Sequence, residues 1–222
     1  MDAIGPAPGA VHQAAGAGWW QRAWPWVGAG VVAFPLAPLV HELGHLAGYA
    51  LAGVGGLRLH YGSMSFEGGQ RFGEHLDRGD LAGAAAIIPF WKVALGSGGG
   101  LVVSCLLVIA CVWLARRWRP HPFVVAFGLI SNSRFATVLG PLTSLIVGGP
   151  VRGPDEVRLA RATGVPLPLV AIVSLGFLVA GSVFLIRAIP RGTRRLAMAA
   201  MTLGAVVSGL LYANVVGPWL LP

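Results

Sequence analysis

Three polar residues, His41, Glu42 and His45, lie within five positions of one apolar stretch. On an α-helix, residues four apart share a face, so both imidazoles can reach one metal ion while Glu42 lies beside its open side. This donor set suits Zn²⁺, which binds imidazole nitrogen at about 2.0–2.1 Å and in catalytic sites keeps a position for water. Zinc lowers the pKa of that water towards about 7, and a glutamate takes its proton as hydroxide attacks a carbonyl. The pattern predicts hydrolysis of a peptide bond with Glu42 as general base.

The surroundings of these residues strengthen that interpretation, because the five-residue pattern alone occurs by chance on the surfaces of many soluble helices. The chain of 222 residues is 55% hydrophobic and 11% charged, against about 25% charged residues in an average soluble chain. An ionisable side chain near the centre of a bilayer costs about 2.5–3.5 kcal/mol on insertion scales. Three polar residues so close together therefore indicate a bound partner, and a metal ion fits best.

Apolar runs of about 20 residues predict the fold class, an all-α polytopic transmembrane bundle with five to six spans. The expected spans are residues 27–53 with a kink or restart near Pro38, 98–115, 123–147, 166–189 and 196–220. Residues 81–115 allow two interpretations: two short spans joined at the glycine run 96–100, or one span preceded by a re-entrant or interfacial segment. Residues 1–26 are expected to be a flexible or interfacial lead-in, and residues 1–222 a single membrane-embedded domain.

The expected partners follow from the same composition. The net charge of +8 comes from basic residues scattered between apolar runs, so no basic face is available to neutralise nucleic-acid phosphates. The lipid bilayer is the expected surrounding, and we expect an integral protein of a bacterial cytoplasmic membrane. Between the first two spans, residues 57–61 and 63–66 alternate apolar and polar side chains around Gly62, which predicts a β-hairpin. Such a hairpin either receives an extended substrate by strand addition or only covers the surface.

The stretch HELGHLAGYALAG (residues 41–53), the polar connector and the glycine-rich start of a later span resemble the site-2 protease family of intramembrane zinc metalloproteases. The resemblance implies a transmembrane protein or peptide as substrate and an aspartate far downstream as third zinc ligand. In the family that aspartate follows an Asn and a Pro and precedes a Gly, a pattern loosely matched by Asn132, Pro141 and Asp155. The separations here are longer, and Glu156 stands where Gly is usual. Residues 157–164 resemble the short helix that follows the ligand.

The remaining acidic residues lead to the same third ligand by elimination. Two histidines and a water leave one vacancy at zinc, which a carboxylate commonly fills. Of the eight acids, only Asp155 and Glu156 come from another spanning region. Asp155 is the expected ligand and Glu156 the alternative; a solvated acid in an arginine-rich stretch is the non-functional interpretation. The resemblance implies that Asn132 is catalytic and binds substrate backbone or the oxyanion, whereas a helix-to-helix hydrogen bond is the alternative.

The arginines and the metal site favour different topologies. If residues 81–115 form two spans, ten arginines lie on one side of the membrane and four on the other, which is a clear positive-inside signal. Asp155, however, then lies on the side opposite His45. If residues 81–93 are re-entrant, Asp155 and His45 meet, and the arginine counts become six and eight. Coordination is the stricter constraint, so five full spans and a partial one are preferred. The alternative function is a non-enzymatic membrane protein, either a degenerate relative that binds partners or a small transporter.

Overall fold

The computed structural model describes residues 18–60, 62–118, 120–147 and 155–216, and in these ranges the chain is almost entirely helical. Its α-helices are α1 (Trp19–Leu51), α2 (Gly69–Asp77), α3 (Leu81–Ile87), α4 (Phe90–Arg117), α5 (Pro122–Ser131), α6 (Phe135–Ile146), α7 (Asp155–Thr163), α8 (Leu167–Ala188) and α9 (Arg194–Leu211). The 3₁₀ turn η1 (Asn132–Arg134) joins α5 to α6, and the π-helical turn η2 (Tyr212–Val216) follows α9. The all-α class predicted from the apolar runs is confirmed.

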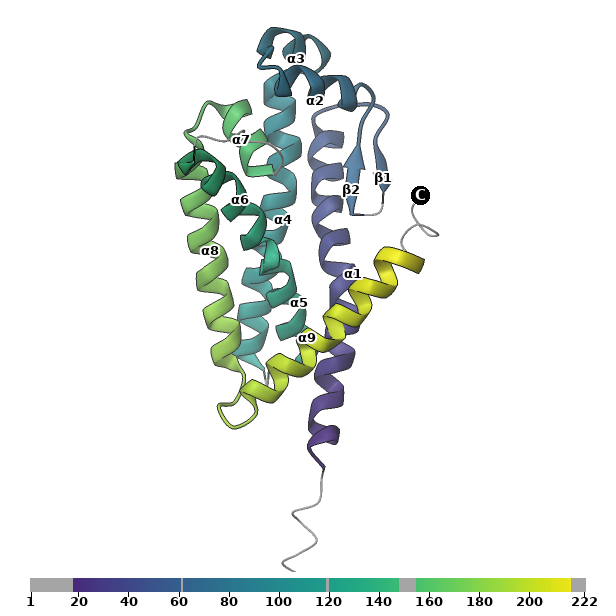
Figure 1. Cartoon of the computed structure of the whole chain (residues 1–222), viewed down its shortest axis with the longest axis vertical. Coiled ribbons are helices and arrows are strands. Elements are labelled where there is room, and N and C mark those ends of the chain that lie inside the picture. The colour runs from purple at the N-terminus through teal and green to yellow at the C-terminus, as the bar shows by residue number, and fades with distance from the viewer. Residues whose placement is uncertain (1–17, 61, 119, 148–154, 217–222) are drawn as a thin grey trace, which may run out of the picture.

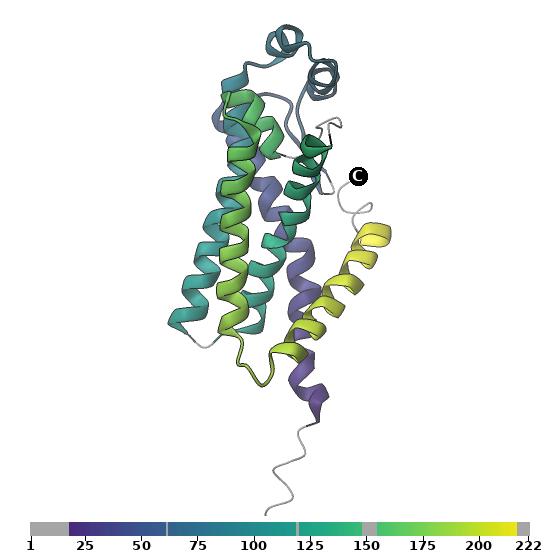
Figure 2. The same cartoon turned by 60° about the vertical axis from the view of Figure 1, so that its left-hand side comes forward.

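Four helices, α1, α4, α8 and α9, are long and apolar enough to cross a membrane, which indicates an integral membrane protein. Figures 1 and 2 show α1, α4 and α8 side by side along the long axis, with α9 leaning across α1. The interrupted run α5–η1–α6 also extends along this axis, from the end where α4 finishes towards the end where α1 finishes (Figure 1). The short elements β1, β2, α2, α3 and α7 gather at the latter end, which we call the connector end.

Helix α4 decides between the two interpretations of residues 81–115. It runs without a break through the glycine run 96–100, so the prediction of two short spans joined there is wrong. Helix α3 is a separate seven-residue helix at the connector end; Ile88 is extended and Pro89 precedes the first residue of α4. Proline has no N–H and a fixed φ, which suits the first positions of a helix and ends the preceding one. Residues 81–89 are thus a short cap at the connector end, and the span expected at residues 98–115 begins at Phe90, so residues 90–97 belong to it and not to a re-entrant segment.

Helix α1 is continuous from Trp19 to Leu51 and passes through three prolines, so the restart expected near Pro38 does not occur. A proline in a helix leaves the carbonyl four residues earlier without its usual N–H donor. For Pro35 that carbonyl belongs to Val31, and the Ser208 hydroxyl of α9 donates to it at 2.7 Å. A neighbouring helix therefore replaces the lost bond, as transmembrane helices commonly allow. The described part of the expected lead-in, Trp19 onwards, forms the first turns of α1.

The predicted hairpin is confirmed by the antiparallel strands β1 (Arg58–His60) and β2 (Ser63–Ser65), with Leu59 opposite Met64. Gly62, in the turn, has φ +65°, a left-handed conformation that glycine adopts without steric cost. Figure 1 shows the hairpin beside the last turns of α1. Helix α7 lies at this same connector end, so Asp155 and the C-terminal half of α1 meet on one side, as the metal geometry required. Among the described residues, five arginines lie at the connector end and seven at the opposite end, so the arginines show no strong positive-inside bias.

Candidate metal centre

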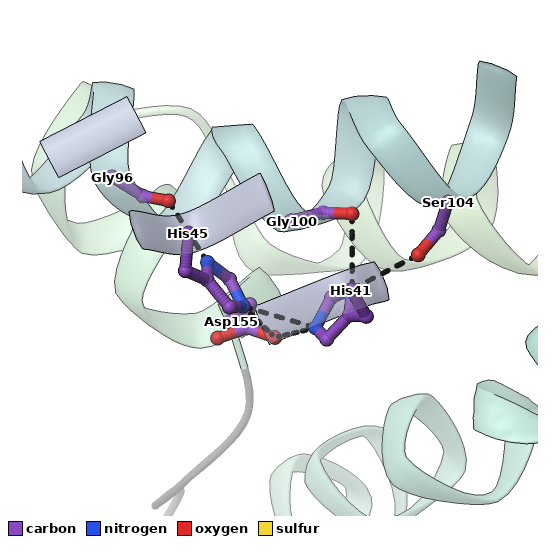
Figure 3. Close-up of polar contacts among 6 residues, drawn as sticks. All are labelled: His41, His45, Gly96, Gly100, Ser104 and Asp155. Atoms are coloured by element: carbon purple, nitrogen blue, oxygen red, sulfur yellow. Dashed lines mark hydrogen bonds and ion pairs between the residues drawn. The ribbon is translucent and has the colours of Figure 1, made fainter. Parts of the chain in front are cut away.

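Three ligand-type side chains from α1 and α7 converge on one point (Figure 3). His41 and His45, one helical turn apart, are 8% and 5% exposed, and their Nε2 atoms lie 2.9 Å apart. The Oδ2 atom of Asp155, the first residue of α7, lies 3.2 Å from each of these nitrogens. Glu42 belongs to the same group, with a carboxylate oxygen within 4.8 Å of an imidazole nitrogen of both histidines. Residues more than a hundred positions apart therefore form one compact site.

Backbone carbonyls of α4 fix the orientation of both imidazoles. The Nδ1 atom of His41 lies 2.9 Å from the Gly100 carbonyl oxygen and 2.9 Å from the Ser104 hydroxyl, and Nδ1 of His45 lies 2.9 Å from the Gly96 carbonyl oxygen (Figure 3). A carbonyl oxygen only accepts, so each Nδ1 must carry the proton and donate it. In a neutral imidazole the other nitrogen then keeps its lone pair. Both Nε2 atoms are thus prepared as metal ligands, the usual outcome of such outer contacts.

Glycines allow α1 and α4 to approach closely enough for these hydrogen bonds. A Cβ atom on Gly44 would lie 2.7 Å from the Gly99 carbonyl oxygen, and one on Gly48 would overlap the Leu95 carbonyl. On the opposite helix, a Cβ atom on Gly100 would overlap both imidazoles and lie 2.7 Å from Cε1 of His41. Small residues commonly allow such close crossings in membrane helices. The glycine run of α4 is therefore the surface against which the two imidazoles pack.

The geometry of this site fits a zinc ion. A tetrahedral ion with bonds of about 2.0–2.1 Å places neighbouring ligand atoms roughly 3.3 Å apart. The three ligand atoms here are separated by 2.9, 3.2 and 3.2 Å. Two nitrogen lone pairs and a carboxylate at such distances repel one another unless a cation or a proton lies between them. Two histidines and one carboxylate are also a known ligand set of catalytic zinc sites, in which water takes the fourth position.

Two cavities adjoin the site, and both include Glu42 and Asp155 in their walls. A small polar cavity of 130 Å³ lies towards the hairpin; we call it the hairpin-side cavity. A larger cavity of 360 Å³ lies towards α5 and has mainly apolar walls that include Phe34, Pro38 and Ile130. Glu42, which is half-buried, is therefore open to space on both sides of the imidazoles. The site therefore has space for water or for part of a larger ligand on either side of Glu42.

Asn132 and Glu156 occupy different places from Asp155. The Asn132 amide donates to the Leu178 carbonyl at 3.1 Å and to the Ser182 hydroxyl at 3.2 Å, so it binds α8. This contact agrees with the helix-packing alternative. Glu156 is 2% exposed, and its side chain is not part of the group of ligand atoms around the two histidines. Of the two acids that the sequence left open, it is Asp155 whose carboxylate oxygen lies 3.2 Å from Nε2 of both histidines, so Asp155 has the position of a ligand.

Two histidines of the connector end, His60 and His75, have polar partners away from the metal centre. His60 Nε2 lies 2.8 Å from the Ser65 hydroxyl across the hairpin. His75 Nδ1 lies 2.7 Å from Asp80 Oδ2, near the start of α3. That carboxylate also accepts from the Gly83 backbone N–H at 2.8 Å. The Gly83 N–H and then His75 hold the pKa of Asp80 below its usual value. Both histidines are therefore explained by local hydrogen bonds at the connector end.

No sequence pattern indicated the contacts that α4 makes with the site. The carbonyls of Gly96 and Gly100 belong to the backbone, which every residue type shares, and Ser104 lies in an apolar run without a motif. The glycine run was the only available signal, and it was interpreted as a possible joint between spans. Comparisons with models of known protein families, with curated proteins and with solved structures gave no match to the chain.

Proposed function

We propose that this protein is a zinc-dependent endopeptidase that hydrolyses peptide bonds of membrane-spanning substrates within the bilayer. The observation that supports it most is the convergence of His41, His45 and Asp155 at 2.9–3.2 Å, with Glu42 beside them. The two histidines and the aspartate would hold zinc. Bound zinc supplies a water of lowered pKa and polarises the substrate carbonyl. Five crossings, α1, α4, α5–η1–α6, α8 and α9, are the proposed topology.

The residues of the chain have separate tasks in this proposal. A Glu42 carboxylate oxygen takes the proton of the attacking water and passes it to the leaving amine, which is general base and then general acid catalysis. The Gly96 and Gly100 carbonyls keep the Nδ1 protons in place, so both imidazoles stay neutral ligands. Asp155 supplies one negative charge, which offsets part of the charge of the ion. Ser104 adds a second contact to His41 and limits rotation of its ring.

The depth of the site supports a substrate inside the membrane. His45 lies six residues before Leu51, the last residue of α1, which is about 9 Å at 1.5 Å per residue. His41 is about 33 Å from Trp19, at the other end of α1, by the same rise. The site therefore lies about a quarter of the length of α1 in from Leu51. Ser63 and Met64 of β2 border the hairpin-side cavity, so we propose that an extended substrate pairs with the hairpin and reaches Glu42.

The first test is metal content after purification without chelators. Wild-type protein is expected to carry about one zinc ion per chain, and His41→Ala is expected to lose it. Glu42→Ala is the matched variant, because it removes a group beside the ligands and should keep the metal while it abolishes cleavage. Zinc-free wild-type protein would contradict the metal site, and full zinc content without Glu42-dependent cleavage would favour a non-enzymatic membrane protein. Residence in a bacterial cytoplasmic membrane stays a prediction.

A further inference from the structure

The hairpin-side cavity carries polar groups that the proposed function has not used. Its walls come from α1, α4, β2, the residue that follows β2, and α7. The lining residues are Glu42, His45, Tyr49, Ser63, Met64, Phe66, Ser97, Asp155 and Arg158. Of the donors among them, which also include the Tyr49 and Ser63 hydroxyls, Ser97 and Arg158 lie on the two helices that carry the metal site, α4 and α7. Their position beside the reacting atoms suggests a direct part in the chemistry.

Ser97 carries a buried hydroxyl near the Tyr49 side chain, which borders the same cavity. Its side chain is 1% exposed, and Oγ makes no hydrogen bond in the part of the chain that the structure describes. Buried hydroxyls are normally paired, since burial without a partner destabilises a protein. The preceding residue, Gly96, holds His45 through its carbonyl, so Ser97 lies on α4 directly beside the metal centre. An oxygen atom in the cavity would give this hydroxyl the acceptor that it lacks.

Arg158 is the permanently charged cation in the wall of this cavity. It follows Asp155 by three residues on α7, so both side chains project from the same face of that helix. No described carboxylate forms an ion pair with Arg158; the ion pairs found in the described ranges are His41–Asp155, His45–Asp155, His75–Asp80 and Glu74–Arg78. Its charge is therefore available to a negatively charged group in the cavity.

Peptide hydrolysis creates such a group. As the water oxygen bonds to the carbonyl carbon, the π electron pair of the C=O bond moves onto the carbonyl oxygen, and Glu42 receives the proton of the water. The negative charge on that oxygen must be stabilised until the C–N bond breaks and the amine takes the proton. The family resemblance assigned this task to Asn132, but the amide group of Asn132 donates its hydrogen bonds to α8. The chain therefore needs other donors near the ligands.

We propose that the Ser97 hydroxyl and the Arg158 guanidinium bind the negatively charged oxygen of the tetrahedral intermediate in the hairpin-side cavity. The inference rests on the proposed peptidase function and adds the oxyanion-binding residues to it. Both donors project from helices that also carry the metal site: α4 holds the imidazoles and α7 begins at Asp155. Donors on rigid elements need little rearrangement as charge develops, which is the basis of their effect in catalysis.

The test measures binding of a phosphinate peptide, which is tetrahedral and negatively charged like the intermediate, against a hydroxamate peptide that binds zinc without a tetrahedral centre. Ser97→Ala and Arg158→Gln are each expected to weaken phosphinate binding about 10- to 100-fold and to change hydroxamate binding less than about threefold. Zinc content should stay at the wild-type value in both variants. Matched controls are Arg161→Gln, one turn further along α7, and Ser208→Ala, a buried serine of α9.

The outcomes separate this inference from the proposed function. If wild-type protein binds zinc and phosphinate and both variants bind phosphinate as tightly as the controls, the oxyanion role is overturned while the peptidase proposal stands. If only one variant weakens binding, the role of the other residue is overturned. If wild-type protein binds neither zinc nor phosphinate, both proposals fail. Arg158 is exposed, so its variant should fold even if the buried Ser97 variant does not.

Discussion

Replacement of Gly100 by alanine tests how far the metal centre depends on close contact between α1 and α4. A Cβ atom at this position would lie 2.7 Å from Cε1 of His41 and would also overlap the ring of His45. Ordinary contact between such carbon atoms begins near 3.4 Å, so the His41 ring or its helix must move by about 0.7 Å. Metal sites tolerate deviations of only about 0.2 Å in ligand distance. The substitution should therefore disturb the ligands directly.

The expected magnitude follows from comparable changes around metal ligands. Loss of an orienting contact typically weakens metal binding about 10- to 100-fold, and insertion of a methyl group into a packed interface costs about 1–3 kcal/mol. We expect Gly100→Ala to lower zinc affinity at least 10-fold in a chelator competition assay and to lower the melting temperature in detergent. The loss is expected even though alanine favours a helix over glycine by about 1 kcal/mol.

Gly98→Ala is the matched control on the same helix. A Cβ atom on Gly98 would meet only the side chain of Leu159, at 3.9 Å, which is normal contact. This variant gains the same helix propensity without overlap, so its zinc affinity should equal that of the wild type and its melting temperature should not fall. Wild-type zinc affinity in Gly100→Ala, or an equal loss in both variants, would refute the argument that α4 supports the imidazoles.

Three further substitutions test individual side chains. Asp155→Asn should weaken zinc binding about 100-fold, whereas Glu156→Gln should leave it unchanged; equal losses in the two would remove the distinction between them. Asn132→Ala should lower the free energy of unfolding by about 1–3 kcal/mol and keep zinc, whereas a catalytic Asn132 would lower turnover at unchanged stability. Because its pKa is lowered from 3.8, Asp80 stabilises the fold above that value and loses its effect as the pH falls through the lowered pKa. The difference in melting temperature between wild type and Asp80→Ala should therefore shrink below pH 3.8, and a constant difference would contradict the assignment.

The sequence was sufficient for the residues whose chemistry is unusual in a bilayer. His41 and His45 share a helix face because of their spacing, and Asp155 was selected because few acids exist in the spanning regions. Coordination geometry also placed Asp155 on the same side as His45, which agrees with the structure, against a statistical argument from arginines. The structure brings these three side chains together as expected, because the expectation rests on side-chain type and helical period, which a sequence records directly.

The contacts supplied by α4 could not be predicted in the same way. Gly96 and Gly100 act through carbonyls and through the absence of a side chain, and a glycine run is equally typical of a loop. Only the packing of α1 against α4 shows that the run is helical and faces the imidazoles. Asn132 was assigned by resemblance, yet the turn of η1 places it against α8. Tertiary contacts therefore decided what local patterns left open.

Cleavage of single-span peptides by protein reconstituted in lipid vesicles tests the central claim most directly. Mass spectrometry of the products should show zinc-dependent cleavage within the apolar stretch, with fragment masses that sum to the peptide plus one water. Zinc-loaded Glu42→Ala protein should give no product. Absence of cleavage by zinc-loaded wild-type protein across the peptides, or equal cleavage by Glu42→Ala, would contradict the proposed peptidase.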